Sequence, residues 1–202
     1  MFDLLFSQYN GYDTIDIVLE IVAVLFGLAS VLFAKKNNIW VYPTGIISTI
    51  IFVYLLNKWG LVGDMMINIY YTTMSIYGWY IWSRKRDNKP EFPISRITLK
   101  ESYYGIVLFL LTIGFVLIVY KYFDKFTHWT AYIDTLSTGI FFVGMWLMAK
   151  RKLENWILWI IGDLVSIPLY FYKGYTFTSI QYAIFTIIAF YGYREWKKNL
   201  NK

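Results

Sequence analysis

The chain has 202 residues, of which 58% are hydrophobic, 22% aromatic and only 16% charged. A soluble domain carries about 25% charged residues, so the 19 basic and 13 acidic side chains are too few to cover a water-facing surface. The same numbers exclude intrinsic disorder and disfavour nucleic-acid binding, despite a net charge of +6. The absence of cysteine excludes disulfides, thiolate catalysis and cysteine-ligated metals. The composition therefore predicts an integral membrane protein.

Seven stretches of about 17–25 nearly uncharged residues predict membrane-spanning helices. In chain order they are Ile17–Ala34, Ile39–Leu56, Leu61–Ser83, Tyr103–Tyr120, Ala131–Ala149, Trp156–Tyr172 and Tyr175–Tyr193. Their apolar runs are continuous rather than alternating, which favours an all-α membrane protein over a β-barrel. The spans contain no lysine or arginine and four acidic residues, Glu20, Asp64, Asp134 and Asp163.

The basic residues predict the orientation of the chain in the membrane. Fifteen of them lie in the odd-numbered connections and the C-terminal tail, against four in the N-terminal tail and the even-numbered connections. Because cytoplasmic loops are enriched in lysine and arginine, the N-terminus is expected outside and the C-terminus in the cytoplasm.

An internal repeat divides the chain into three spans, one linker span and three further spans. A shift of 116 residues carries Trp40 onto Trp156 and Tyr54 onto Tyr170, and a shift of 114 carries Gly60 onto Gly174. One linker span leaves both triplets facing the same way, so a parallel repeat with a substrate site at the repeat interface is expected. The expected boundaries within this single transmembrane domain are about 16–83 for repeat one, 103–120 for the linker helix and 131–196 for repeat two.

Three segments resemble a known family. They are the run ENWILWIIGDLVSIPLY at Glu154–Tyr170, the sequence YGWY at Tyr77–Tyr80 and the ending YGYREW at Tyr191–Trp196. These segments closely resemble the Pnu family of bacterial vitamin transporters, and the likeness extends over roughly residues 15–198.

The resemblance implies a fold similar to the SWEET transporters and a multi-pass, often homotrimeric facilitator of the bacterial inner membrane. Family members of the PnuC, PnuT and PnuX types take up nicotinamide riboside, thiamine and riboflavin, respectively. It also implies that the vitamin is trapped inside by a cytoplasmic kinase that acts downstream without contacting the transporter. Nicotinamide riboside members carry Asn where this chain has Asp163, which favours thiamine as the substrate and leaves nicotinamide riboside as the alternative.

The sixth span carries the strongest candidate site. Asp163 is expected about 10 Å below the membrane surface, where a carboxylate costs about 2.5–3.5 kcal/mol and needs a partner. It shares one helical stripe with Trp156, Trp159 and Tyr170. A carboxylate between aromatic faces suits a flat cationic heterocycle such as the thiazolium of thiamine or the pyridinium of nicotinamide riboside, and suits neutral riboflavin less. A structural hydrogen bond of Asp163, an interfacial aromatic belt at Trp156 and a proton-carrying role for Asp163 remain open.

Further polar residues at similar depth extend the predicted binding site. They are Asn68 and Tyr71 in the third span and Gln181 and Tyr182 in the seventh, all of which could equally well tie helices together. Pro168 interrupts the sixth span near Asp163 and is the candidate gating residue.

Other functional classes lack their residues. The last span has no lysine for a retinal Schiff base, and the single histidine, His128, lies in a loop without a zinc or serine-nucleophile motif. No catalytic residue, metal or cofactor is therefore predicted, and the expected partners are the lipid bilayer and a small cationic vitamin.

Overall fold

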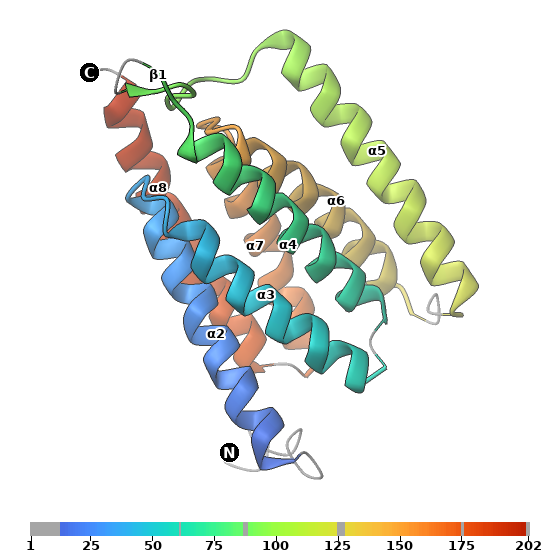
Figure 1. Cartoon of the computed structure of the whole chain (residues 1–202). Coiled ribbons are helices and arrows are strands. Elements are labelled where there is room, and N and C mark those ends of the chain that lie inside the picture. The colour runs from blue at the N-terminus through green and yellow to red at the C-terminus, as the bar shows by residue number, and fades with distance from the viewer. Residues whose placement is uncertain (1–12, 61, 87–88, 125–127, 175, 201–202) are drawn as a thin grey trace.

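The structure is a computed structural model that describes residues 13–60, 62–86, 89–124, 128–174 and 176–200 (Figure 1). These ranges contain seven helices, one for each predicted span. They are α2 (Thr14–Lys35), α3 (Val41–Lys58), α4 (Val62–Ser83), α5 (Leu99–Tyr122), α6 (Thr130–Ala149), α7 (Asn155–Tyr172) and α8 (Thr176–Leu200). Two short antiparallel strands, β1 (Lys85–Arg86) and β2 (Lys89–Pro90), follow α4. The predicted all-α class is therefore confirmed, with this small hairpin as an addition.

Helices α5 and α8 exceed the spans that hydropathy predicts by the most residues. Helix α5 begins at Leu99 because Thr98 and Glu101 form a capping box, in which the Thr98 hydroxyl accepts from the Glu101 N–H at 3.2 Å. Helix α8 continues through its charged end to Leu200. Hydropathy therefore marks the part of a helix that lies in lipid, whereas caps and local propensity decide where the helix ends.

Five of the seven described helices, α2, α3, α5, α6 and α7, are long and apolar enough to cross a membrane. The remaining two, α4 and α8, each lie between other helices, since α4 contacts α3 and α6 while α8 contacts α7 and α2. Each of them buries one serine, Ser75 in α4 and Ser179 in α8.

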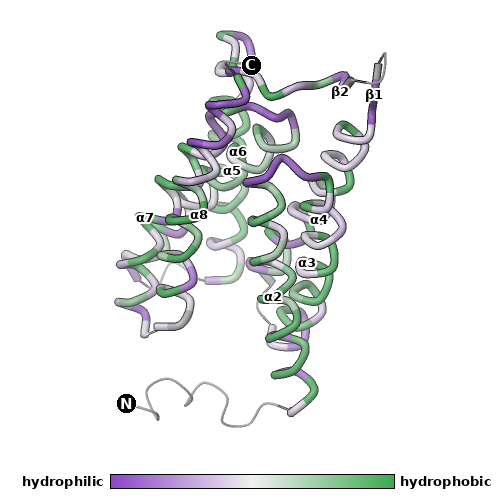
Figure 2. The backbone as a smooth tube through the Cα atoms, turned by 90° about the vertical axis from the view of Figure 1, so that its left-hand side faces the viewer, coloured by the Kyte–Doolittle hydropathy of each residue, from purple (hydrophilic) through white to green (hydrophobic). Residues whose placement is uncertain are grey.

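Six helices form a closed ring, with α5 outside it. Helices α2, α3 and α4, here called the first triplet, pack in chain order, and so do α6, α7 and α8, the second triplet. The ring closes through contacts of α2 with α8 and of α4 with α6, while α5 packs mainly on α6. Figure 2 shows the first triplet on one side of the molecule and α7 and α8 on the other.

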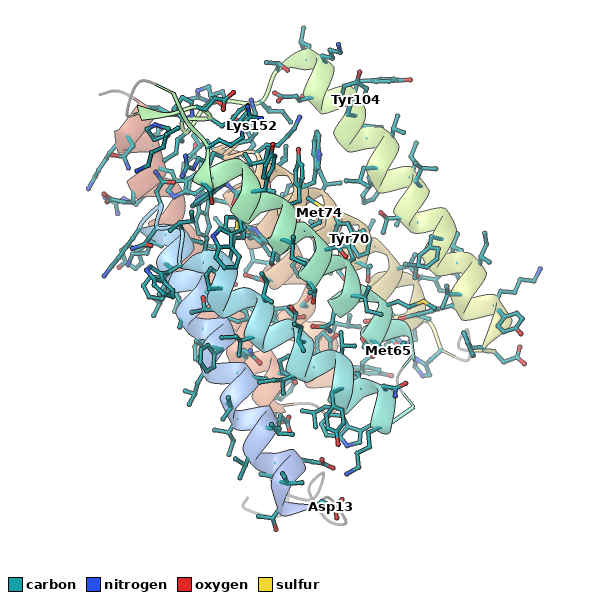
Figure 3. All side chains as sticks on the ribbon, in the orientation of Figure 1. Asp13, Met65, Tyr70, Met74, Tyr104 and Lys152 are labelled. Atoms are coloured by element: carbon teal, nitrogen blue, oxygen red, sulfur yellow. The ribbon has the colours of Figure 1, made fainter. Side chains whose placement is uncertain are left out.

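The two ends of the bundle differ in charge. We call the end that carries the α2–α3 loop, the α4–α5 segment, the α6–α7 loop and the end of α8 the basic end, and it is strongly hydrophilic in Figure 2. There the α4–α5 segment is held on the α6–α7 loop by backbone hydrogen bonds from Ser95 to Arg151 (3.1 Å) and from Leu153 to Ser95 (2.9 Å). Figure 3 places Lys152 at this end and Asp13 at the opposite one.

Ion pairs hold the opposite end of each triplet. Lys58 contacts Asp13 at 2.8 Å and Asp16 at 2.7 Å, and Lys173 pairs with Asp134. The hydrogen bond and the charge of Lys58 lower the pKa of the exposed Asp13 carboxyl below its ordinary value. Each pair joins the first helix of a triplet to its second helix.

The two triplets share the same loop backbone at a constant offset of 114 residues. Positive φ angles occur at two equivalent pairs, Asn37 and Arg151 (51° and 53°) and Gly60 and Gly174 (70° and 84°). Loop hydrogen bonds recur at the same offset, from Asn38 to the Phe33 carbonyl and from Lys152 to the Leu147 carbonyl, both at 2.9 Å.

The predicted offset of 116 at the first junction is therefore wrong. Trp156 corresponds to Tyr42 rather than to Trp40, and Tyr170 corresponds to Leu56 rather than to Tyr54. Burial agrees, because Trp156 and Tyr42 are 1% and 0% exposed, whereas Trp40 is 58% exposed. The identical residues Trp40 and Trp156 thus lie on different helical faces of the two triplets.

Candidate functional site

A cavity of about 230 Å³ lies between the two triplets. All six helices of the ring contribute to its wall, and α5 does not. The lining residues are Gly27, Ser30, Val31, Ala34, Val41, Gly45, Ser48, Thr49, Tyr71, Ser75, Phe141, Met145, Met148, Trp156, Trp159, Asp163, Tyr182, Phe185 and Ala189. The expected site at the interface between the triplets thus coincides with a cavity.

Among the residues that the structure describes, Asp163 is the one acidic residue of the cavity wall. It is only 2% exposed, and no lysine, arginine or histidine in the described ranges forms an ion pair with it. A buried carboxylate without a cation is costly unless a ligand or proton compensates it. Within the same ranges, no group of three or more His, Cys, Asp and Glu side chains is placed to hold a metal ion.

The second triplet forms an aromatic wall around this carboxylate. The Phe141 ring lies 5.4 Å from the Trp159 ring and 6.0 Å from the Tyr182 ring, with an interplanar angle of 11° to Tyr182. From α4, Tyr71 approaches Trp159 at 6.4 Å between ring centroids. Its neighbour Tyr70 does not line the cavity but stacks on Phe142 of α6, and its hydroxyl donates to the Phe142 carbonyl at 2.9 Å.

The first triplet forms a wall of small residues. Most of its lining residues are small, namely Gly27, Ser30, Ala34, Gly45, Ser48, Thr49 and Ser75, and the larger ones are Val31, Val41 and Tyr71. Several hydroxyls also tie its helices together, since Ser30 donates to the Val41 carbonyl at 2.7 Å and Ser48 donates to the Ala23 carbonyl at 2.8 Å. The cavity therefore has one aromatic, acidic side and one small, hydroxyl-rich side.

Five of the eight predicted binding residues line this cavity, namely Trp156, Trp159, Asp163, Tyr71 and Tyr182. Trp156 is 1% exposed, which argues against the interfacial belt as its role, and its indole N–H has no acceptor among the described residues.

Three predicted residues lie outside the wall. Tyr170 stacks on Tyr182 at 5.2 Å and so supports a wall residue from behind. The Asn68 amide donates to the carbonyl of Asp64 in its own helix at 2.9 Å. Gln181 precedes Tyr182, and adjacent residues on a helix point about 100° apart, so only one of the two faces the cavity. Pro168 is exposed within a helix that continues past it, and it does not line the cavity.

The binding residues predicted from the sequence do not include the hydroxyl-rich wall of the first triplet. An offset of 114 residues places Thr49 at the position of Asp163 and Gly45 at that of Trp159, and all four line the cavity. An internal alignment at the correct offset therefore contains the signal for the second wall.

The chain is similar to known membrane transporters over nearly its full length. The family profile described as nicotinamide mononucleotide transporter matches residues 17–198. The nicotinamide riboside transporter PnuC of Escherichia coli is 26% identical, over 93% of this chain and 87% of the relative. The riboflavin/roseoflavin transporter RibM of Streptomyces davaonensis is 23% identical, over 88% of this chain and 83% of the relative.

A solved structure has the same fold. The crystal structure of the vitamin B3 transporter PnuC superposes with a TM-score of 0.70 at 22% identity, covering 93% of this chain and 84% of that one. Together with the apolar helices, these matches identify a multi-pass protein of the bacterial inner membrane. The chain belongs to the Pnu family of membrane vitamin transporters.

Proposed function

We propose that this transporter carries a cationic B-vitamin compound through the cavity, with thiamine as the favoured substrate. The observation that carries the proposal is Asp163, a buried carboxylate in an aromatic wall with no ion pair in the described part of the chain. A bound cation would supply the missing charge, and Trp159 would hold its ring by stacking and cation–π contact.

The choice between vitamins depends on charge. Thiamine and nicotinamide riboside each carry a cationic ring, whereas riboflavin is neutral and would leave Asp163 unpaired. Thiamine is favoured because this chain has an acid where the nicotinamide riboside members that it resembles have Asn. Nicotinamide riboside is the second candidate, since relatives matched over nearly the full chain carry that substrate in their names.

The proposed transport cycle is a rocking of the two triplets about the cavity. Support comes from the symmetric helix contacts of the ring and from the constant offset of 114 residues, which suit a parallel repeat about an axis along the membrane normal. The basic end is assigned to the cytoplasm because it carries most lysines and arginines. Pro168 remains a proposed hinge in α7 rather than a wall residue.

Uptake is proposed to need no ion gradient and no chemical step in this protein, with a cytoplasmic kinase trapping the vitamin. A homotrimeric assembly is part of the same proposal. Gradient-free uptake with a trapping kinase and a homotrimeric assembly are both proposed because the chain resembles the Pnu family.

A binding titration tests the proposal. Purified protein is titrated with thiamine, nicotinamide riboside and riboflavin by isothermal calorimetry in the same detergent. Thiamine is expected to bind tightest and riboflavin weakest. Tightest binding of nicotinamide riboside would support the second candidate, and tightest binding of riboflavin would overturn the cationic-substrate proposal.

A further inference from the structure

Two indole hydrogen bonds join the triplets at the basic end. The main contacts between triplets are α4 with α6 and α2 with α8. In the first, the Trp82 Nε1–H donates to the Ala149 carbonyl at 3.1 Å, and in the second the Trp196 Nε1–H donates to the Ala34 carbonyl at 2.9 Å. The donor belongs each time to the last helix of one triplet and the acceptor to the first helix of the other.

These bonds are buried and depend on the triplets staying together. Trp82 is 4% exposed and Trp196 is 0% exposed. Their acceptors lie in the last turns of α6 and α2, where carbonyls lack the i+4 partner that they have mid-helix, although the Ala34 carbonyl also accepts from the Asn37 N–H at 2.9 Å. If the triplets separated, each indole N–H would have to find water, because a buried donor without an acceptor is unfavourable.

Each indole is supported by a ring from the middle helix of its own triplet. Tyr42 meets Trp82 edge to face at 5.0 Å and 87°, and Trp156 meets Trp196 at 5.6 Å and 89°. Both the rings and the indoles are related by the offset of 114 residues. The two donors are thus equivalent, whereas their acceptors, Ala34 and Ala149, are 115 residues apart, one position from exact equivalence.

A glycine makes room for each supporting ring. A Cβ atom at Gly78 would lie 2.3 Å from the Tyr42 ring, and one at Gly192 would lie 2.7 Å from the Trp156 ring. Such close approach requires glycine at both positions. Gly78 and Trp82, four residues apart in α4, therefore serve one packing unit, and Gly192 and Trp196 serve the equivalent unit in α8.

The buried cluster that contains Trp82 and Trp196 closes the cavity on the side of the basic end. Several residues belong both to the cavity wall and to the buried cluster that contains Trp82 and Trp196, namely Ala34, Val41, Met145, Met148, Trp156 and Ala189. A solute leaving the cavity toward the basic end must therefore pass through this cluster, which requires α4 to part from α6 or α2 from α8.

We propose that Trp82 and Trp196 are paired latches of the gate at the basic end, whose indole N–H bonds keep the cavity closed and break when the triplets part. This role goes beyond substrate binding, since neither indole lines the cavity.

Cysteine accessibility tests the latch without any substrate. The chain has no cysteine, so Ser75→Cys places a single thiol in the cavity wall. The rate at which a membrane-impermeant methanethiosulfonate reagent modifies this thiol is measured in vesicles, from the side that carries the C-terminus, located by protease cleavage of a C-terminal tag. Trp82→Phe and Trp196→Phe are each expected to raise the rate about fivefold, and the double variant about 25-fold.

The control and the isosteric variant make the result decisive. Trp79→Phe changes an exposed tryptophan one turn earlier in α4 and is expected to leave the rate unchanged. Site-specific benzothienylalanine at position 82 or 196 keeps the ring volume but replaces N–H with sulfur, so it separates the hydrogen bond from packing if a Phe variant fails to fold. Rates equal to the Trp79→Phe control, or a rise only from the opposite side, would overturn the latch. Because no vitamin is present, a wrong substrate assignment cannot produce either outcome.

Discussion

The surroundings of Asp163 make it the central residue of the proposed binding site. It is buried in a wall of rings and has no ion pair among the described residues, so a bound cation is the natural source of the compensating charge. We predict that Asp163→Asn weakens thiamine binding at least about tenfold, or about 1.4 kcal/mol, because the amide keeps the shape but loses the charge. Isothermal calorimetry on purified protein measures this change.

A melting curve without ligand provides the control for Asp163→Asn. Removing an uncompensated buried charge should leave the melting temperature unchanged or raise it. Asp13→Asn, which alters an exposed acid at the opposite end of the bundle from the basic end, should leave thiamine affinity unchanged. Unchanged affinity in Asp163→Asn would contradict the assigned role.

Trp159 is the second residue on which binding depends. Trp159→Leu retains an apolar side chain but removes the aromatic face, so thiamine affinity should fall about fivefold to tenfold. The matched control is Trp79→Leu, which changes an exposed tryptophan of α4 and should leave affinity intact. Tryptophan fluorescence quenching reports both, and equal affinities in the two variants would refute stacking on Trp159.

Sequence spacing predicts which side chains of one helix share a face, and it is most reliable for residues within two turns of each other. Asp163 and Trp159 share one stripe of α7, and both line the cavity. Asn68 could not be predicted in the same way, because its amide is bound to a carbonyl of its own helix. The choice between Gln181 and Tyr182 depends on the rotation of α8, which packing against α7 and α2 decides.

The packing of α6 on α7 shapes the site at the scale of elements. A Cβ atom at Gly162 would lie 2.3 Å from the Phe141 ring, and Phe141 lines the cavity. We predict that Gly162→Ala lowers stability by about 1–3 kcal/mol through overpacking and also weakens thiamine binding. Thermal unfolding in detergent, with a titration on the same preparation, tests both effects.

The matched control for this packing is Gly114→Ala in α5. Nothing lies within 4 Å of a Cβ atom there, so the higher helix propensity of alanine should keep or raise the melting temperature. Equal melting temperatures of the two variants would show that the Gly162–Phe141 approach is not limiting.

Elements were predictable from hydropathy, but their ends and register were not. The Thr98–Glu101 capping box extends α5 beyond its predicted span, and no hydropathy scale contains that signal. The tryptophans and tyrosines indicate the repeat, whereas its offset follows from the equivalent loop backbones of Asn37 and Arg151.

At the scale of the whole molecule, scarce charge explains much of the architecture. All basic residues lie outside the predicted spans, and most of them belong to one end of the bundle. That end is hydrophilic, and the apolar helices between the ends suit a membrane (Figure 2). Closure of the six helices into a ring, and the position of α5 outside it, depend on side-chain packing that single-sequence patterns do not encode.

The measurement that tests the account most directly is uptake of radiolabelled thiamine into proteoliposomes without any ion gradient. The account predicts that thiamine equilibrates to equal concentrations on both sides, that an imposed proton gradient does not change the endpoint, and that Asp163→Asn slows uptake at limiting concentration. Accumulation that follows the proton gradient would contradict facilitated transport and support the proton-coupled alternative. Equally fast uptake by Asp163→Asn would contradict the role of the buried carboxylate.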